Sequence, residues 1–173
     1  MAQASEKLFG EQPDDATVHV KHFSEMTARE VYDLLELRVA VFVVEQQCAY
    51  QEVDGLDLDA IHVWLSRHGQ VVACARVMKP GVESECVSIG RVVSRARGLG
   101  DGERVLREAV RVAEERLGAD SIYLEAQVYA RGFYEKQGFG AVGEEFLLDG
   151  IRHIRMIRTG RGEIQRCPSV HGL

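Results

Sequence analysis

The sequence predicts an α/β protein built on one mixed, mostly antiparallel sheet with flanking helices. Its strand-like and helix-like segments follow the order strand, helix, several strands, helix, strand, helix, strands, without the strict alternation of a doubly wound fold. The 173 residues suffice for one domain that folds without disulfide or metal support. Hydrophobic residues make up 46% and charged residues 28%, which excludes a mainly disordered chain.

The N-terminal half predicts a strand, a helix and then a group of antiparallel strands. Thr27 and Glu30 form a capping-box pattern that opens the helix, since each side chain can bond the backbone amide of the other. The apolar positions that give this helix a buried face are Val31, Leu34, Leu35 and Val41. The expected strands are Val18–Phe23, Ile61–Ser66, Val71–Met78 and Cys86–Val93. The short connection 67–70 makes the middle two a hairpin.

The C-terminal half predicts a long amphipathic helix over Glu103–Leu117, which ends at Gly118 because glycine favours the left-handed cap conformation. Leu106, Ala109, Ala113 and Leu117 form its apolar face. A strand over Ser121–Val128, a short helix over Ala130–Gln137, strands over Phe139–Val142, Glu145–Leu148 and His153–Arg158, and a turn at Asp149–Gly150 complete the pattern. We expect a flexible segment over 1–16, one domain over 17–158 and a loose tail over 159–173.

Charge and hydropathy exclude several functional classes. The net charge of −6 argues against a nucleic-acid or anionic-membrane partner. No apolar run reaches the ~18 residues of a membrane helix, and the N-terminal residues lack the apolar core of a secretory signal, which favours a cytoplasmic location. The cysteines lack C-x-x-C spacing, so we expect no metal site and interpret them as buried thiols, with Cys48 in a polar loop as the one to watch.

The segment from Ile89 to Gly102 is a strand, a glycine-rich turn and a helix start. Such a turn lets backbone amides converge on an anion, and the helix N-terminus adds partial positive charge. Arg97 would add a forked donor suited to phosphate oxygens. The spacing matches neither a P-loop nor G-x-G-x-x-G. A flexible connection whose glycines only permit positive φ explains this segment equally well.

Two motifs in sequence order carry a family resemblance. R-x-x-G-x-G (Arg97, Gly100, Gly102) precedes A-x-x-F-Y-E-K-x-G-F (Ala130–Phe139), with one helix and one strand between them. Together they resemble the GNAT superfamily of acyl-CoA-dependent N-acyltransferases, over roughly residues 18–158. Four further segments resemble the ElaA-like branch of that superfamily: Leu37–Gln46, Tyr50–Asp57, Ile89–Val93 and Asp149–Ile154.

The resemblance implies acetyl-CoA as co-substrate, bound in a cleft where the two central strands, 86–93 and 121–128, splay apart. The implied cofactor-binding residues are Arg91, Val92, Val93, Arg97, Gly98, Leu99, Gly100, Gly102, Gln127 and Phe133. Tyr134 matches the family tyrosine that protonates the departing thiolate, and the amine attacks the thioester directly.

The residue that accepts the amine proton is open. Glu125 is the preferred candidate because strand alternation places it on the same face as Gln127. Arg38, Glu45 and His62 are candidate substrate contacts, and Glu45, His62 or a water chain are other possible bases. Each has a structural alternative. His62 could be a satisfied histidine beside Trp64, Arg38 and Glu45 could pair with each other, and the acidic loop with Asp54, Asp57 and Asp59 could steer an amine or simply be solvated.

The sequence therefore predicts an acetyl-CoA-dependent N-acetyltransferase for a primary amine of a small molecule or a protein. The alternative is a non-catalytic acyl-CoA-binding sensor or interaction module, which a short segment before Arg97 and the charge of Asp101 beside the diphosphate would favour. A third interpretation is an interaction domain without a CoA site. A homodimer is plausible by resemblance.

Overall fold

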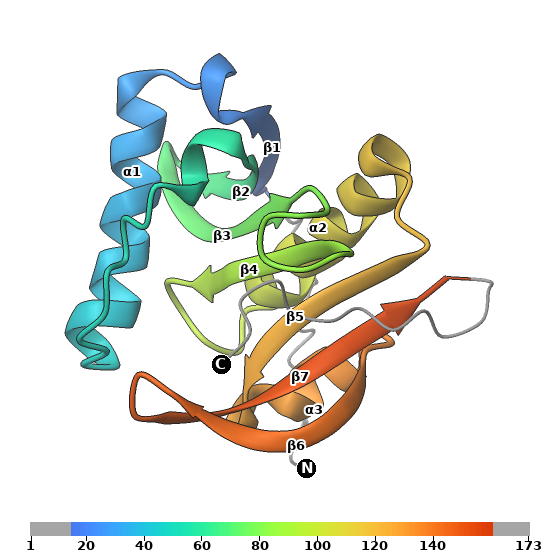
Figure 1. Ribbon diagram of the computed structural model, residues 1–173. Helices are drawn as coiled ribbons and strands as arrows, with labels where there is room; N and C mark the ends of the chain where they lie inside the picture. The colour runs from blue at the N-terminus through green and yellow to red at the C-terminus, as the bar shows by residue number, and fades with distance from the viewer. Residues whose placement is uncertain (1–14, 161–173) are drawn as a thin grey trace, which may run out of the picture.

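One seven-stranded sheet organises the chain (Figure 1). The computed structural model describes residues 15–160. The strands are β1 (Thr17–His22), β2 (Ile61–Arg67), β3 (Gln70–Met78), β4 (Val87–Ser94), β5 (Ser121–Gln127), β6 (Gly140–Leu148) and β7 (Ile151–Thr159), in the spatial order β1-β2-β3-β4-β5-β7-β6. Every neighbouring pair is antiparallel except β4 and β5. The predicted mixed, mostly antiparallel α/β fold is confirmed.

The helices begin and end at local signals in the sequence. They are α1 (Ala28–Arg38), α2 (Asp101–Leu117) and α3 (Arg131–Glu135). At the start of α1, the Thr27 amide donates to Glu30 Oε2 at 2.8 Å, and the Glu30 amide donates to Thr27 Oγ1 at 3.3 Å. The predicted capping box is therefore present. Gly118 ends α2 with φ +61°, as its cap position requires.

Two helices cover opposite faces of the sheet (Figure 1). Because side chains alternate along a strand, β2 directs Val63 and Leu65 to the core under α2 and Trp64 to the opposite face. Leu34 and Leu37 of α1 cover Trp64 there. No helix among residues 15–160 is long and apolar enough to cross a membrane.

The structure differs from the predicted elements in three places. The helix expected to reach Val41 changes after Arg38 into a π-helical segment, Val39–Glu45. The predicted helix after β5 is reduced to Arg131–Glu135. The two strands predicted between 139 and 148 are one strand, β6, interrupted by an irregularity between Val142 and Phe146. Gly143, with φ +73°, supplies the backbone conformation that the irregularity needs.

The predicted flexible segment 1–16 and the predicted tail 159–173 lie mostly outside the described residues. Ala16 is already buried in the core, and β7 extends to Thr159.

A buried ion network fastens the acidic loop between α1 and β2 to the sheet. Arg38, at the end of α1, bonds Glu52 and also donates to Asp57 Oδ1 at 2.7 Å. Arg76 of β3 contacts three carboxylates: Asp54 at 2.9 Å, Asp57 at 3.3 Å and Glu83 at 2.8 Å. The interpretation of Asp54 and Asp57 as solvated or substrate-steering residues is thus wrong, because both carboxylates are held by buried guanidinium groups.

The arginines of this network hold Asp54 and Asp57 ionised. Burial alone would raise the pKa of Asp57, but the hydrogen bond from Arg38 and the charges of Arg38 and Arg76 outweigh it and lower that pKa. The same balance lowers the pKa of Asp54, where Arg76 and Arg91 outweigh burial. These carboxylates stabilise the fold above their unfolded pKa near 4, and their contribution is lost as the pH falls through the lower folded values.

Arg76→Met should lower the free energy of unfolding by about 3–5 kcal/mol, because it leaves buried Asp57 and half-buried Asp54 and Glu83 without their shared cation. The measurement is urea denaturation at pH 7. Arg29→Met is the matched control, since Arg29 is 82% exposed in its pair with Asp33 and should change stability by less than about 0.5 kcal/mol. Equal small changes in both variants would show that the network does not hold the loop.

Candidate functional site

The site begins where β4 and β5 separate. Their parallel pairing covers only Val87 with Ile122 and Ser88 with Tyr123, after which the strands diverge. In the pairing of β4 with β3, Cys74 lies opposite Val93 and Arg76 lies opposite Gly90. Two residues of β4 therefore face one residue of β3, which is a β-bulge. Arg91 lies in this bulge with φ +53°, a conformation that non-glycine residues rarely adopt. The edge of β4 beyond Ser88 therefore faces open space rather than β5.

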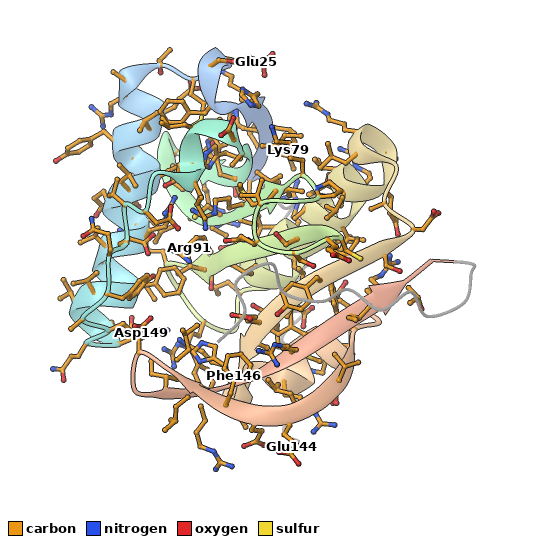
Figure 2. The ribbon with its side chains drawn as sticks, in the orientation of Figure 1. Glu25, Lys79, Arg91, Glu144, Phe146 and Asp149 are labelled. Atoms are coloured by element: carbon orange, nitrogen blue, oxygen red, sulfur yellow. The ribbon has the colours of Figure 1, made fainter. Side chains whose placement is uncertain are left out.

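A cavity of about 690 Å³ lies beside the separated strands. Its walls come from β4, β5, the start of α3, the connection after α1, and the β6–β7 hairpin. In Figure 2 the labelled residues Arg91, Phe146 and Asp149 mark three of these segments, namely β4, β6 and the turn before β7. This volume is within the usual range for a small-molecule site.

β5 supplies a row of polar groups to the cavity. Tyr123, Glu125 and Gln127 all line it, as strand alternation predicts for Glu125 and Gln127. The Tyr123 hydroxyl donates to Glu125 Oε1 at 2.7 Å, and Arg155 Nε lies 3.8 Å from the same oxygen. Burial, followed by the bond to Glu125, raises the pKa of Tyr123, so this phenol is protonated at neutral pH.

Gln127 joins β5 to the π-helical segment across the cavity. Its Nε2 donates to Gln46 Oε1 at 3.1 Å, and Gln46 Nε2 donates to the Tyr129 hydroxyl at 3.2 Å. Gln46 is the residue that ends the π-helical segment, where its amide bonds the Val41 carbonyl. The wider π turn therefore decides where this amide side chain enters the cavity.

Tyr134 lines the cavity from α3 and is half-buried. Its ring packs edge-on against Phe133 and Phe139, with centroids 5.0 and 6.1 Å away. Burial raises the pKa of its phenol, so the hydroxyl carries its proton at neutral pH. Among residues 15–160, no hydrogen bond engages this hydroxyl. The geometry leaves Tyr134 able to donate a proton into the cavity.

A second cavity, of about 370 Å³, lies at the start of α2. Its lining consists of Ser94, Ala96, Arg97, Gly98, Gly100, Gly102, Glu103 and Phe133. Gly98 and Gly100 have φ near +80°, so the turn needs glycine at both positions. Arg97 pairs with Glu45 at 2.5 Å, but both side chains are largely exposed, so the pair is weak enough to exchange for another anion. Leu99 is exposed and is not among the lining residues.

Asp101 is not among the residues that line this second cavity. Its carboxylate is buried against Arg67, whose Nη2 and Nη1 lie 2.9 and 3.1 Å from the two oxygens. The expectation that the charge of Asp101 would lie beside a diphosphate is therefore wrong, because Arg67 neutralises it on the other side. This removes one reason for the non-catalytic alternative.

The three predicted substrate contacts lie outside the larger cavity. Arg38 is buried between Glu52 and Asp57, and the suggested Arg38–Glu45 pair is not formed, because Glu45 bonds Arg97. His62 Nε2 donates to the Asp57 carbonyl at 3.1 Å. Burial lowers the pKa of His62, so the ring is neutral at pH 7.

The hydrogen bond to Asp57 confirms the alternative that His62 is a satisfied histidine. Its ring packs near Phe23, at 6.3 Å, whereas Trp64 stacks on His19 at 4.8 Å. His62 and Trp64 are two residues apart in β2. The ring that packs against each of them comes from the segment 19–23, namely Phe23 for His62 and His19 for Trp64.

Val92 and Arg91 line the larger cavity, whereas Val93 is buried against α1. Five further residues line the cavity but are not among the predicted site residues: Tyr50, Glu83, Tyr123, Phe146 and Arg155. The alternation of β5 could have identified Tyr123. The other four come from segments that only the sheet order and the loop network bring together. Of the cysteines, Cys48 lines the cavity as a buried thiol and Cys74 is buried in the core. The interpretation as a buried thiol is wrong for Cys86, because this residue is disulfide-bonded. Cys167 lies outside the described residues.

Known proteins share both the sequence and the fold of this chain. Residues 14–159 match the family model of the acetyltransferase (GNAT) domain. Protein ElaA of Escherichia coli is 41% identical over 141 residues, which cover 79% of this chain and 92% of that protein. A UPF0039 protein of Mycobacterium tuberculosis is 40% identical over 148 residues, covering 82% and 92%.

Solved structures give the same result. An acyl-CoA N-acyltransferase from Pseudomonas aeruginosa superposes with a TM-score of 0.76 at 44% identity, over 83% of this chain and 99% of that one. Escherichia coli ElaA superposes with a TM-score of 0.77 at 37% identity, with the same coverage. The splayed β4–β5 pair and the glycine-lined cavity before α2 lie within the matched region. The chain belongs to the GNAT acetyltransferase family and to its ElaA-like branch.

Proposed function

We propose that this protein is an acetyl-CoA-dependent N-acetyltransferase that acts on a primary amine. The observation that carries the proposal is the separation of β4 from β5, which leaves a strand edge free beside a cavity that Tyr134 and Glu125 line. The similarity to the acyl-CoA N-acyltransferase from Pseudomonas aeruginosa supports acyl-CoA-dependent N-acyl transfer. The cytoplasmic location and the homodimer stay predictions.

Backbone groups would hold most of the co-substrate. The free edge of β4 at Arg91, Val92 and Val93 would pair with the pantetheine arm as an added strand does. The turn from Arg97 to Gly102 would bind the pyrophosphate through its amides, with the Arg97 guanidinium exchanging Glu45 for a phosphate oxygen. Acetyl-CoA supplies the thioester carbonyl as electrophile, and an amide of the β4 bulge would polarise that carbonyl.

Two side chains would move protons during transfer. Glu125 would accept a proton from the ammonium group of the acceptor, whose lone pair then attacks the thioester carbon. As the C–N bond forms and the C–S bond breaks, Tyr134 would give its proton to the departing thiolate. The contribution of Tyr134 is modest, because a thiolate with a pKa near 8.5 is already a tolerable leaving group.

Saturating acetyl-CoA should raise the melting temperature by about 5–10 °C, since a ligand at 100 times its Kd adds about 2.7 kcal/mol. A screen of primary amines should then show CoA release that depends on the amine. Absence of any thermal shift at millimolar acetyl-CoA would contradict the proposed site. A shift without release for any amine would contradict catalysis and favour a binding module.

Gly102→Glu should weaken acetyl-CoA binding at least tenfold, because it adds a carboxylate to the cavity where the pyrophosphate would lie. Position 102 is preferable to Gly100, whose φ of +80° strains any other residue. Gly102→Ala is the control: its Cβ would lie 3.6 Å from Ser94 Oγ, an ordinary contact, so binding should change little. Isothermal titration calorimetry measures both affinities. Unchanged affinity in Gly102→Glu would refute this assignment.

Tyr134→Phe should lower kcat about 10- to 100-fold while the Kd for acetyl-CoA changes less than threefold, because only the proton donor is removed and the packed ring remains. Steady-state kinetics with an amine from the screen, together with calorimetry, separate the two quantities. Equal kcat in the variant would remove Tyr134 from the mechanism.

A further inference from the structure

We propose that the acceptor is a small α-amino acid, whose carboxylate binds Arg155 and whose amino group meets Glu125. This inference rests on the proposed function and names its substrate class. It depends on one guanidinium group in the cavity that the fold leaves without a hydrogen-bonded anion.

Of the residues that the structure describes, two arginines line the larger cavity, and their surroundings differ. Arg91 Nε lies 3.0 Å from Glu52 and its Nη2 lies 3.0 Å from Asp54, and its guanidinium is 5.1 Å from the centre of the Tyr50 ring. These contacts occupy Arg91 within the buried network. Its role is to hold the β4 bulge, and it has no charge to spare for an acceptor.

Arg155 is placed differently. Its cross-strand neighbours are Glu125 on β5 and Val142 on β6, and its guanidinium lies over the Phe146 ring at 4.6 Å. Within residues 15–160 its buried Nε has no hydrogen-bond partner, and the oxygen of Glu125 at 3.8 Å is too distant for one. The guanidinium group also bonds the Tyr123 side chain. Stacking on the Phe146 ring orients the planar group, and a planar guanidinium held in this way suits bidentate binding of a carboxylate.

Glu125 and Arg155 together present opposite charges at one point of the cavity. Because they are direct cross-strand neighbours, their charged groups lie side by side on the same face of the sheet. The Tyr123 hydroxyl holds Glu125 on its other side. An α-amino acid carries its ammonium and carboxylate groups on one carbon, so it can satisfy both residues at once. A polyamine would instead bring a second cation toward Arg155.

The other carboxylates of the cavity do not compete for this role. Glu83 is held by Arg76 at 2.8 Å and by the Ser88 hydroxyl at 2.8 Å. Asp149 is in the β6–β7 turn, six residues along the hairpin from Arg155. The amino group of the acceptor therefore meets Glu125. Glu125 is also the residue proposed to accept the proton of that amino group.

The test compares each of the standard L-α-amino acids with its own α-carboxamide as acceptor, by mass spectrometry of the acetylated product. We expect kcat/KM for the preferred amino acid to exceed that of its amide by about 10- to 100-fold. The amide has the less basic amine, so a larger fraction of it is unprotonated and nucleophilic at neutral pH. This difference favours the amide, so it cannot produce the expected preference for the amino acid.

Arg155→Gln should abolish this preference, with the loss mainly in KM for the amino acid and little change for the amide. Arg155→Lys should restore part of it, since it keeps the charge without the fork. The matched control is Arg152→Gln, which removes an arginine of the same strand that is exposed and pairs with Glu145, and it should leave both rates unchanged. Equal rates for acid and amide, or equal losses for both in Arg155→Gln, would overturn the proposal.

A binding measurement separates this inference from the proposed function. Thermal melting with 10 mM amino acid or amide, with and without CoA, requires no turnover. Protection by the amino acid alone, lost in Arg155→Gln, would support the carboxylate site even if no acetyl transfer is found. Transfer to amines combined with equal protection by acid and amide would contradict the inference while leaving the acetyltransferase function standing.

Discussion

The brief contact between β4 and β5 is the constraint on which the rest of the structure depends. β4 and β5 are paired at only two positions, so the centre of the sheet is open beyond them. Other elements must therefore hold the two strands in place. α2 covers one face under β2, β3 and β4, and the β6–β7 hairpin extends β5 on the other side of the opening. The opening is thus built into the packed sheet, with the edge of β4 on one wall and the polar face of β5 on the other.

The buried ion network supports the wall that β4 forms. Arg91 lies in a conformation with positive φ, which costs energy unless its surroundings hold it there. Glu52 and Asp54 do so from the loop after α1, and the same loop is anchored through Arg38 and Arg76. Isolated, each of these charges would be expensive to bury. Together these ion pairs specify one position for the loop between α1 and β2. The position of this loop in turn fixes the shape of the β4 bulge and of the cavity. This explains why Arg38, a plausible substrate contact from its sequence context, is a structural residue.

The chemistry of the cavity follows from the alternation of β5 and its register with β7. One face of β5 carries Tyr123, Glu125 and Gln127, and the register sets Arg155 opposite Glu125. A base candidate, its hydrogen-bonded phenol and a cation thereby meet on one face, across the cavity from the strand edge at which a thioester would lie. Tyr134 approaches from α3 with its proton retained by burial. In the proposed reaction the two proton transfers would take place at different walls of the cavity, which suits a direct attack without a covalent enzyme intermediate.

The sequence by itself determined what depends on neighbouring residues. The capping box at Thr27, the hairpin between β2 and β3, the cap at Gly118 and the glycine turn before α2 all follow from local backbone preferences, and the ordered motifs identified the family. Only the tertiary structure decided which charges meet. Asp101 with Arg67, Arg38 with Asp57 and Glu125 with Arg155 are each separated by 19 or more residues, so no periodicity links them. Local sequence encodes dihedral angles and buried faces, whereas the partner of a charge depends on strand register and loop path, which the whole packed sheet sets.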